Sequence, residues 1–368
     1  MKRKNRIPLS VVTVLAVVFM MAVSCDKKDS PDNNVVIPPD TTNNVDTTGI
    51  PQGWKKLGDW TANDIIWAIT SDGSGNVYVA GYFKNQDGYC YVAKWNGTSW
   101  SELGSLKANA GIYSLTCDNQ GHVYAVGAFT NGAVPGGGQA YVAMWDGTKW
   151  NDIGGGGGTF ISSDDAGHLF LERQMWTGSA WVYLCTDCPM AIGGSIYSII
   201  ANPDGSVRYA AGDFSLQSGY RWVAKCDGSN CWSELGSIMA NARINAMAMD
   251  KDGNIYAAGA FTDGNLPTTG HQYVAKWDGS EWSKLGNLNA NGELYYLAVD
   301  PVSGNVYVSG YNTNTAGEST VVKWNGTTWS DLGNMRIAPA AIHVDKNGKL
   351  YSVVAAATTP TFTVVVHD

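Results

Sequence analysis

The sequence has 368 residues and a formal net charge of −8, with 15 Trp and 18 Tyr but only 15% charged residues. Four of its basic residues lie within the first six positions, so the chain without them carries −12. This acidic balance excludes a basic surface for nucleic acid. The aromatic content suits a chain that buries a large core.

Residues 1–25 predict an export signal. The basic stretch "MKRKNR" precedes the apolar run "IPLSVVTVLAVVFMMAVS", which is the order of a secretory signal peptide. The segment ends in "AVSC", which resembles the lipobox of bacterial lipoproteins, although Ala22 stands where Leu is commonest. The resemblance implies lipidation of Cys25 and a lipid-anchored, extracytoplasmic position in the cell envelope, at the outer membrane. The alternative is an uncleaved anchor of about 18 residues, which is short for a spanning helix of about 20.

Residues 26–52, "DKKDSPDNNVVIPPDTTNNVDTTGIPQ", are rich in Asp, Asn, Thr and Pro. Such a segment has almost nothing to bury, so it predicts a disordered tether. The tether separates the signal from residues 53–368, which we expect to form one globular, strand-rich unit.

Residues 53–368 repeat one pattern, whose marker is a tryptophan that is followed in most copies by "xxLG". The markers are Trp54, Trp100, Trp150, Trp181, Trp232, Trp282 and Trp329, at spacings of 46, 50, 31, 51, 50 and 47 residues. The fullest copies add an apolar run, an Asp, a Gly turn and a segment such as "NVYVAG". Each copy therefore predicts four short strands separated by turn residues.

Asn-Gly and Asp-Gly pairs supply the positive φ angles of tight hairpin turns. They recur at Asn96-Gly97, Asp146-Gly147, Asp278-Gly279 and Asn325-Gly326. Four-stranded units at a period of 40 to 50 residues are typical of a β-propeller. A β-sandwich needs no such repeat, and a solenoid needs capping units at both ends. We therefore predict an all-β, seven-bladed, monomeric β-propeller over residues 53–368.

The two ends of the repeat array predict how the ring closes. The sequence stops at "TFTVVVHD", where a third strand is due, and the repeats begin with "GWKKLG", an isolated fourth strand. The N-terminal strand is thus expected to complete the last blade and to remove an exposed edge. The spacing of 31 between Trp150 and Trp181 marks one shortened blade, for which we expect three strands.

The "DxxGNVYVAG" half of the repeat is similar to the bacterial SBBP and kelch-like repeat propellers, and the similarity covers residues 53–368. The resemblance implies a seven-bladed fold in an extracytoplasmic protein. The double-glycine signature of kelch repeats and the GH…WD signature of WD40 repeats are absent from this sequence. The hairpin "WDGSEW" resembles the Asp-box of sialidases, but its Gly directly follows the Asp, so no sialidase activity is carried over.

The lengths of the connections within each repeat also predict that the two faces of the propeller differ. If the first strand of each blade is innermost, the D-x-x-G and Asn-Gly turns share one face, and the longer connections at 84–88, 130–140 and 262–272 share the other. We call the second the long-loop face and expect it to carry function. The hairpin tryptophans, such as Trp95 and Trp100, are expected to pack between neighbouring blades.

Two sets of repeat-equivalent residues are expected to ring the mouth of the central channel on the long-loop face. The aromatic set is Trp67, Tyr113, Tyr197 and Tyr295, and the amide set is Asn63, Asn109, Asn241 and Asn291. Aromatic rings beside amides suit a sugar, which offers apolar C–H faces and hydroxyl groups. The alternative interpretation is structural, with rings that fill blade interfaces and asparagines that hold turns.

Other chemistry receives weaker support from the sequence. "DKDGN" at 250–254 starts like a calcium loop but lacks the later ligands, including a bidentate Glu, so a turn is favoured. His122 and His168 take a turn position, and no triad or metal spacing emerges. We expect no catalytic residue set, no metal and no cofactor. An acid pair across the channel is the remaining enzymatic alternative, with Glu172, Glu293 and Glu318 at unknown distances.

Six cysteines remain after Cys25. Cys226 and Cys231 flank a four-residue turn, where opposed hairpin positions lie within disulfide reach. Cys185 and Cys188 form "CTDC", which predicts a local disulfide or a free pair in an exported protein. Cys90 and Cys117 are expected to be buried thiols.

The sequence as a whole favours an envelope-anchored lipoprotein that binds a glycan or a protein through its long-loop face. A polysaccharide-active enzyme with acids in the channel is one alternative. A structural surface-display domain is the other.

Overall fold

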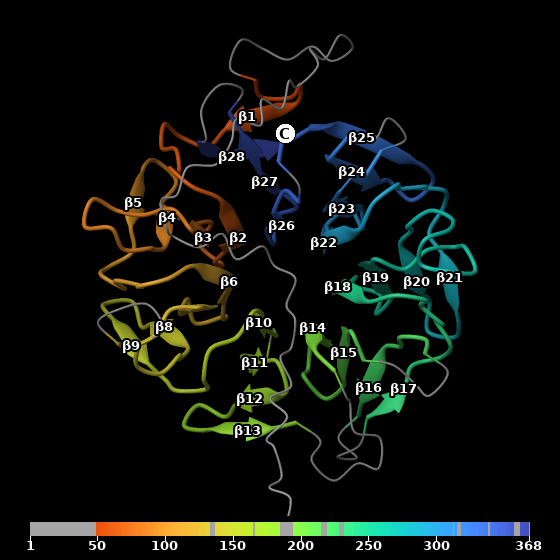
Figure 1. Cartoon of the computed structure of the whole chain (residues 1–368), viewed down its shortest axis with the longest axis horizontal. Coiled ribbons are helices and arrows are strands. Elements are labelled where there is room, and N and C mark those ends of the chain that lie inside the picture. The colour runs from red at the N-terminus through yellow and green to blue at the C-terminus, as the bar shows by residue number, and fades with distance from the viewer. Residues whose placement is uncertain are drawn as a thin grey trace, which may run out of the picture. The chain divides into compact units, whose positions relative to one another are not determined.

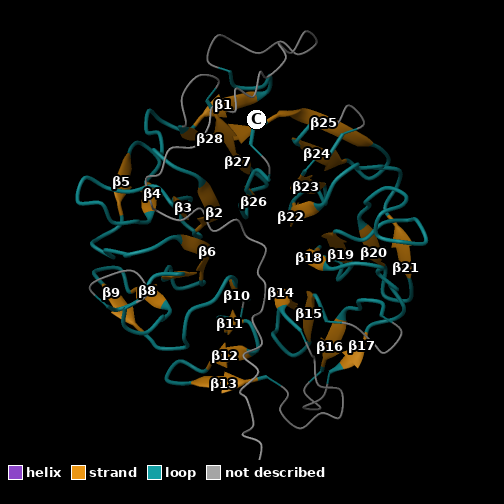
Figure 2. Cartoon of the chain, viewed as in Figure 1, coloured by secondary structure: helices purple, strands orange, loops and turns teal. Residues whose placement is uncertain are grey.

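The computed structural model describes residues 49–132, 137–164, 166–184, 194–214, 219–227, 232–311, 313–314, 318–337, 339–356 and 361–367. All of them belong to one compact unit, Thr42–Asp368. The described residues contain 28 strands and no helix, and the strands form seven four-stranded antiparallel sheets. The sheets stand around a common centre as the blades of a β-propeller (Figures 1 and 2).

We number the blades in chain order. Blade 1 is β2 (Ile66–Ser71), β3 (Val77–Gly81), β4 (Ala93–Trp95) and β5 (Trp100–Glu102). Blade 2 is β6 (Ile112–Cys117), β7 (Val123–Gly127), β8 (Ala143–Trp145) and β9 (Trp150–Asp152). Blade 3 is β10 (Ile161–Ser163), β11 (Leu169–Leu171), β12 (Gln174–Trp176) and β13 (Trp181–Tyr183). Blade 4 is β14 (Ile196–Ala201), β15 (Arg208–Gly212), β16 (Ala224–Cys226) and β17 (Ser233–Glu234).

Blade 5 is β18 (Ile244–Met249), β19 (Ile255–Gly259), β20 (Ala275–Trp277) and β21 (Trp282–Lys284). Blade 6 is β22 (Leu294–Val299), β23 (Val306–Gly310), β24 (Thr320–Trp324) and β25 (Trp329–Asn334). Blade 7 is β26 (Ile342–Val344), β27 (Leu350–Ala355), β28 (Phe362–His367) and β1 (Trp54–Lys56). The first strand of each blade lies innermost (Figure 1) and contacts the first strands of its neighbours.

Blade 7 closes the ring as predicted. The N-terminal strand β1 pairs antiparallel with the last strand β28, with Trp54 opposite His367. Trp54 is buried, and its indole donates a hydrogen bond of 2.7 Å to the Leu332 carbonyl of blade 6. The two ends of the repeat array therefore share one sheet, in which β1 covers the edge that β28 would otherwise expose.

The tryptophan hairpin fastens blades 1, 2, 3, 5 and 6 to the blade before each of them in the ring. The Trp150 indole donates to the Leu103 carbonyl at 2.6 Å, 47 positions away. Gly104 beside it has φ of 61°, and a Cβ at this position would lie 2.3 Å from the Trp145 ring. The "LG" of one copy is thus the contact point for both tryptophans of the next copy. The prediction that these tryptophans pack between blades is confirmed.

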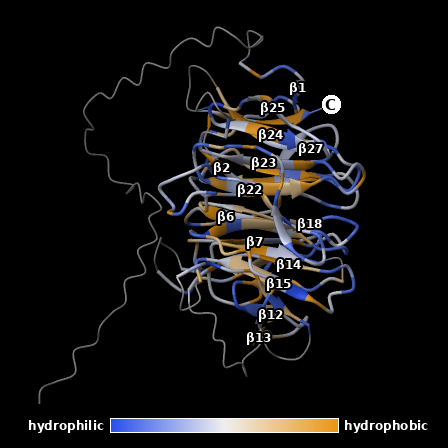
Figure 3. Cartoon of the chain, turned by 90° about the vertical axis from the view of Figure 1, so that its right-hand side faces the viewer, coloured by the Kyte–Doolittle hydropathy of each residue, from blue (hydrophilic) through white to orange (hydrophobic). Residues whose placement is uncertain are grey.

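The second strand of a blade forms most of its core. All five residues of β3 are buried, as are those of β7, β19 and β23. Such a strand lies between neighbours on both faces, which explains its continuous apolar run. Figure 3 shows the hydrophobic strands stacked through the molecule, with hydrophilic residues concentrated in the connections.

Blade 3 corrects one prediction. Its short period led us to expect three strands, but the sheet has four. The missing length comes from the connection between its second and third strands, where only Glu172 and Arg173 separate β11 from β12. Glu172 adopts φ of 49°, which lets the chain reverse at once. The blade is short because it lost a loop, whereas its strands remain.

The predicted signal segment and most of the predicted tether lie outside the described residues. Among the residues that are described, no helix is long and apolar enough to span a membrane. Cys25 and its lipidation stay predictions.

Candidate functional site at the long-loop face

A β-bulge starts the innermost strand in five of the blades. In blade 1, Ile66 pairs with Gly81 and Ala68 pairs with Ala80, so Trp67 is the extra residue. The equivalent extra residues are Tyr113, Tyr197, Asn245 and Tyr295. A bulge re-aims a side chain and is common beside functional sites. The three predicted aromatic residues besides Trp67 therefore share its local geometry.

A glycine at the end of the second strand makes this bulge possible. A Cβ on Gly259 would lie 2.2 Å from the Arg243 carbonyl oxygen, so only glycine fits. The next residue, Ala260, donates its backbone N–H to the same carbonyl at 3.0 Å. In blade 6, Tyr311 donates to the Glu293 carbonyl at 2.9 Å in the same way. The backbone is fixed at this point, while the side chain that precedes the innermost strand is free to differ between blades.

The predicted aromatic residues fall into separate groups on the rim. Trp67 packs edge-on against Tyr82, and Tyr82 packs edge-on against Tyr113, with ring centroids 6.4 and 6.0 Å apart. Tyr295 packs against Tyr311 at 5.4 Å in blade 6. Trp67, Tyr113, Tyr197 and Tyr295 are all half-buried. They share the rim of one face, but the contacts bring only Trp67 and Tyr113 together, through Tyr82.

The predicted asparagines hold loops. The Asn241 side chain accepts from the Thr262 N–H at 2.9 Å and donates to the Gly264 carbonyl at 2.9 Å. Asn109 makes the same bonds to Thr130 and Gly132, and Asn63 bonds both backbone groups of Lys84. Asn291 is exposed. The side chains of Asn63, Asn109 and Asn241 therefore hold loops, as the structural alternative expected. Ligand binding by the four asparagines stays a prediction.

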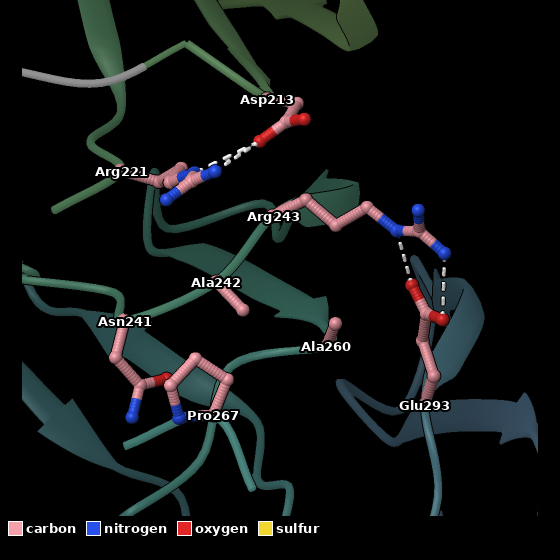
Figure 4. A pocket seen from close by; sticks show the side chains of 8 residues that line it. All are labelled: Asp213, Arg221, Asn241, Ala242, Arg243, Ala260, Pro267 and Glu293. Atoms are coloured by element: carbon pink, nitrogen blue, oxygen red, sulfur yellow. Dashed lines mark hydrogen bonds and ion pairs between the residues drawn. The ribbon is translucent and has the colours of Figure 1, made fainter. Parts of the chain in front are cut away.

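An open pocket of about 340 Å³ lies on this face and is shared by blades 4, 5 and 6. It is lined by Asp213, Arg221, Asn241, Ala242, Arg243, Ala260, Pro267 and Glu293 (Figure 4). These residues come from the connections that lead into the innermost strands and from those that follow the second strands, including the long loop at 262–272. The pocket thus lies on the long-loop face that the sequence predicts.

Two ion pairs shape the pocket. Arg221 forms an ion pair with Asp213 at 2.8 Å. Arg243 of blade 5 donates two hydrogen bonds, of 2.5 and 2.7 Å, to Glu293 of blade 6. Figure 4 shows the Arg243 side chain extended toward Glu293, with Asp213 facing Arg221. The Arg243–Glu293 pair is bidentate, which fixes both groups in orientation as well as distance.

Tyr295 and Asn245 complete this cluster. The Tyr295 hydroxyl accepts from Arg243 Nη2 at 3.2 Å and donates to Glu293 Oε2 at 3.0 Å. Asn245 donates to Glu293 Oε1 at 2.8 Å. Burial, together with the neighbouring Glu293 carboxylate, raises the pKa of Tyr295 to about 12. The hydrogen bonds to Glu293 likewise raise the pKa of Arg243, so the hydroxyl stays protonated and the guanidinium stays charged at neutral pH.

The opposite face consists of structural turns. Asp250 in "DKDGN" accepts from the N–H groups of Asp252 and Asn254, from the Asn254 amide and from the Tyr256 hydroxyl. His122 and His168 each bond an aspartate of their own turn at 2.7 and 2.8 Å. Among the described residues no group of three or more His, Cys, Asp or Glu side chains is arranged to hold a metal ion.

The described cysteines, together with Glu172 and Glu318, do not line the pocket. Cys90 is buried, and burial raises the pKa of the Cys117 thiol. The structure describes Cys226 as a buried free thiol. Its proposed partner Cys231 lies outside the described residues, as do Cys185 and Cys188, so both disulfides stay predictions about an oxidised form. Glu318 bonds Asn314 at 2.9 Å, and Glu172 forms the blade 3 turn.

The sequence interpretation missed Arg243 as a site residue, and it considered Glu293 only as a possible channel acid. A usable signal was present two residues after each "AN" asparagine. At that position the copies hold Ile65, Gly111, Arg243 and Glu293. Opposite charges therefore occupy one repeat position in consecutive blades, where an ion pair across the interface is to be expected.

Comparisons with known proteins show the fold. No protein-family model matches the sequence, and no curated protein matches it. The solved structure of YCF48 bound to D1 peptide is 14% identical with a TM-score of 0.54, and the match covers 86% of this chain and 96% of that one. An inactive virginiamycin B lyase from Staphylococcus aureus with quinupristin is 9% identical with a TM-score of 0.59, covering 86% and 99%. The WD40 β-propeller domain of Doa1 is 11% identical with a TM-score of 0.55, covering 85% and 96%. The chain shares the β-propeller fold with all three.

Proposed function

We propose that this protein is a binding module, lipid-anchored at Cys25 in the cell envelope, that takes a glycan or a protein on its long-loop face. The observation that carries the proposal is the pocket of Figure 4, where charged side chains from three blades meet at half-exposed positions. The anchor rests on the sequence alone, through the lipobox-like "AVSC".

Repeat geometry supports a role in binding. The main chain of each bulge is fixed by the same glycine contact, so the fold is compatible with different side chains before each innermost strand. In blades 5 and 6 these side chains are Arg243 and Glu293. Partly exposed charged side chains at a concave site are typical of a surface that binds a ligand and not of a packed core. A display domain with no ligand needs no such cluster.

Binding also accounts for the cluster better than catalysis does. Both carboxylate oxygens of Glu293 are engaged, by Arg243, Asn245 and Tyr295. A general acid or base needs to reach the substrate proton directly or through one water. The Glu293 carboxylate therefore orients Arg243 and is not free to transfer a proton to a substrate. For a protein ligand, YCF48 bound to D1 peptide provides a precedent among propellers of similar fold.

A pair of matched variants tests the proposal. Leu266 is 58% exposed on the long loop beside Pro267, and Val302 is 65% exposed on a turn of the opposite face. The full chain in detergent would be screened against arrayed glycans and envelope proteins, and then Leu266→Arg and Val302→Arg would be compared. We expect Leu266→Arg to weaken binding and Val302→Arg to leave it unchanged. Equal binding by both variants, or no ligand of either class, would overturn the proposal.

A further inference from the structure

The pocket carries no net charge among its paired side chains. Asp213 balances Arg221, and Glu293 balances Arg243. A site that selects an anion or a cation leaves an excess of the opposite charge, because unpaired charge supplies the attraction. This pocket instead presents donors and acceptors side by side, which favours a neutral polar ligand.

The polar groups are held in position before any ligand arrives. Arg243 is fixed by two bonds to Glu293 and one to Tyr295, and Glu293 is fixed in turn by Asn245. Asn245 also donates to the Leu294 carbonyl at 2.8 Å, which ties the cluster to the backbone of blade 6. Binding therefore requires little further loss of side-chain freedom, and preorganisation of this kind improves affinity.

Unused hydrogen-bonding capacity remains on both ion pairs. Within the described part of the chain, Arg243 Nη1 and Asp213 Oδ2 make no hydrogen bond. The two side chains are 39% and 41% exposed. A hydroxyl group both donates and accepts, so the hydroxyls of one sugar can bond a free guanidinium N–H and a free carboxylate oxygen that line the same pocket.

Apart from Asn241, the remaining lining is small and apolar. Ala242, Ala260 and Pro267 contribute no hydrogen-bonding side chain to the pocket. Tyr311 is 42% exposed, and its ring packs edge-on against Tyr295 at the margin of the cluster. Rings of this kind receive the C–H face of a sugar. The volume of about 340 Å³ lies at the small end of ligand sites, which range over about 300–1,000 Å³.

We infer that this pocket takes one neutral pyranose residue of a glycan. Its hydroxyls bind Arg243 Nη1 and Asp213 Oδ2, and its apolar face rests toward Tyr311. The inference rests on the proposed function and narrows it to a sugar. Of the predicted aromatic set, Tyr295 bonds Arg243 and Glu293 of this pocket, whereas Trp67 and Tyr113 do not line it. An anionic sugar is not expected, since it would meet Asp213 and Glu293 without a spare cation.

Calorimetric titration of the full chain in detergent tests the inference. The probes are neutral oligosaccharides of glucose, mannose and galactose, with oligogalacturonate as the anionic comparator. The matched variants are Arg243→Gln and Lys251→Gln, because Lys251 pairs with Asp252 on the opposite face at 2.9 Å. We expect at least a tenfold loss of affinity for a neutral oligosaccharide in Arg243→Gln and less than a twofold change in Lys251→Gln.

Further variants keep the test decisive if Arg243→Gln fails to fold. Arg243→Lys retains the charge but not the bidentate geometry, and Tyr311→Ala removes an exposed ring. Each should lower the affinity about tenfold, with an unchanged melting temperature for Tyr311→Ala. Wild-type affinity in all folded variants, or tighter binding of oligogalacturonate, would overturn the inference.

The two proposals fail in distinguishable ways. If the chain binds no neutral oligosaccharide but does bind a protein in a manner sensitive to Leu266→Arg, the sugar inference falls and the binding module stands. If the chain binds ligands of neither class, both fall.

Discussion

The indole of Trp100 donates a hydrogen bond of 2.5 Å to the carbonyl of Leu57, a residue 43 positions earlier in the sequence. Trp100 belongs to blade 1, and Leu57 follows β1 in blade 7. The same contact recurs between Trp282 and Leu235 and between Trp329 and Leu285. The bond at Leu57 therefore joins blade 1 to blade 7, across the interface where the ring closes.

Deletion of residues 53–58 should destabilise the protein far more than deletion of residues 26–50. The first deletion removes β1, the buried Trp54 and the Leu57 carbonyl that Trp100 binds. Loss of one buried aromatic side chain alone costs about 3–5 kcal/mol. The melting temperatures of the two truncated chains provide the measurement. Equal values would contradict closure by the N-terminal strand.

Acid should destabilise the fold through its turn aspartates. Burial acts to raise the pKa of Asp250, but bonds from Asn254 and Tyr256 outweigh it and hold the pKa below the ordinary value of 3.8. Asp72 and Asp118 behave in the same way. A folded pKa below the unfolded one gives stability that is fully present above about pH 5, and this stability is lost as the pH falls from about 3.9 through the lower folded pKa.

The unfolding free energy, followed in urea from pH 7 to pH 3, checks this dependence. Asp250→Asn should be less stable at pH 7 and should lose less stability on acidification than the unmodified chain. Identical pH profiles for the two chains would show that this turn does not contribute.

The aromatic rim can be tested as a set. Because Trp67, Tyr113 and Tyr295 are half-buried, we expect their joint replacement by Ala to leave the fold intact. Ligand binding should weaken, since the Tyr295 hydroxyl bonds both Arg243 and Glu293. Three fully buried aromatics would cost about 9–15 kcal/mol, which approaches the entire stability of about 5–15 kcal/mol of a typical domain. Circular dichroism and binding assays distinguish the outcomes. A variant that fails to fold would assign these rings to the core, and one that binds normally would exclude them from the site.

Cys25→Ala should release the protein from membranes or leave it as a retained precursor. A single acyl chain anchors weakly and stable attachment takes more than one signal, so loss of the lipidated residue leaves little to hold the chain. Membrane fractionation and gel mobility provide the measurement. Normal processing with unchanged fractionation of the variant would rule out the lipid anchor.

The architecture was predictable because the repeat encodes it locally. Asn96-Gly97 and its equivalents specify hairpins, and the lone strand at Trp54 specifies closure. Blade 3 was mispredicted because a period of 31 residues gives the length lost and not its position. The loss of a loop and the loss of a strand shorten the sequence by similar lengths. The tight turn at Glu172 shows that the loop is the missing part.

The site was predicted less completely, for two physical reasons. Arg243 and Glu293 are 50 positions apart, and their contact depends on the closeness of neighbouring blades. The asparagines were taken to face a ligand, yet the Asn241 amide bonds the backbone of a loop 21 positions later. A residue type shows which bonds a side chain offers, whereas the partner depends on the fold. The bulges that re-aim Trp67 and Tyr295 were also invisible in the residue pattern.

Hydrogen–deuterium exchange of the full chain, with and without its tightest ligand at saturation, tests the central claim most directly. If the long-loop face binds the ligand, protection should appear at residues 241–243, 262–272 and 291–295. The turns at 250–254 and 300–305 should exchange as they do in the free protein. Protection confined to those turns, or to the outer strands such as β13, would contradict the account.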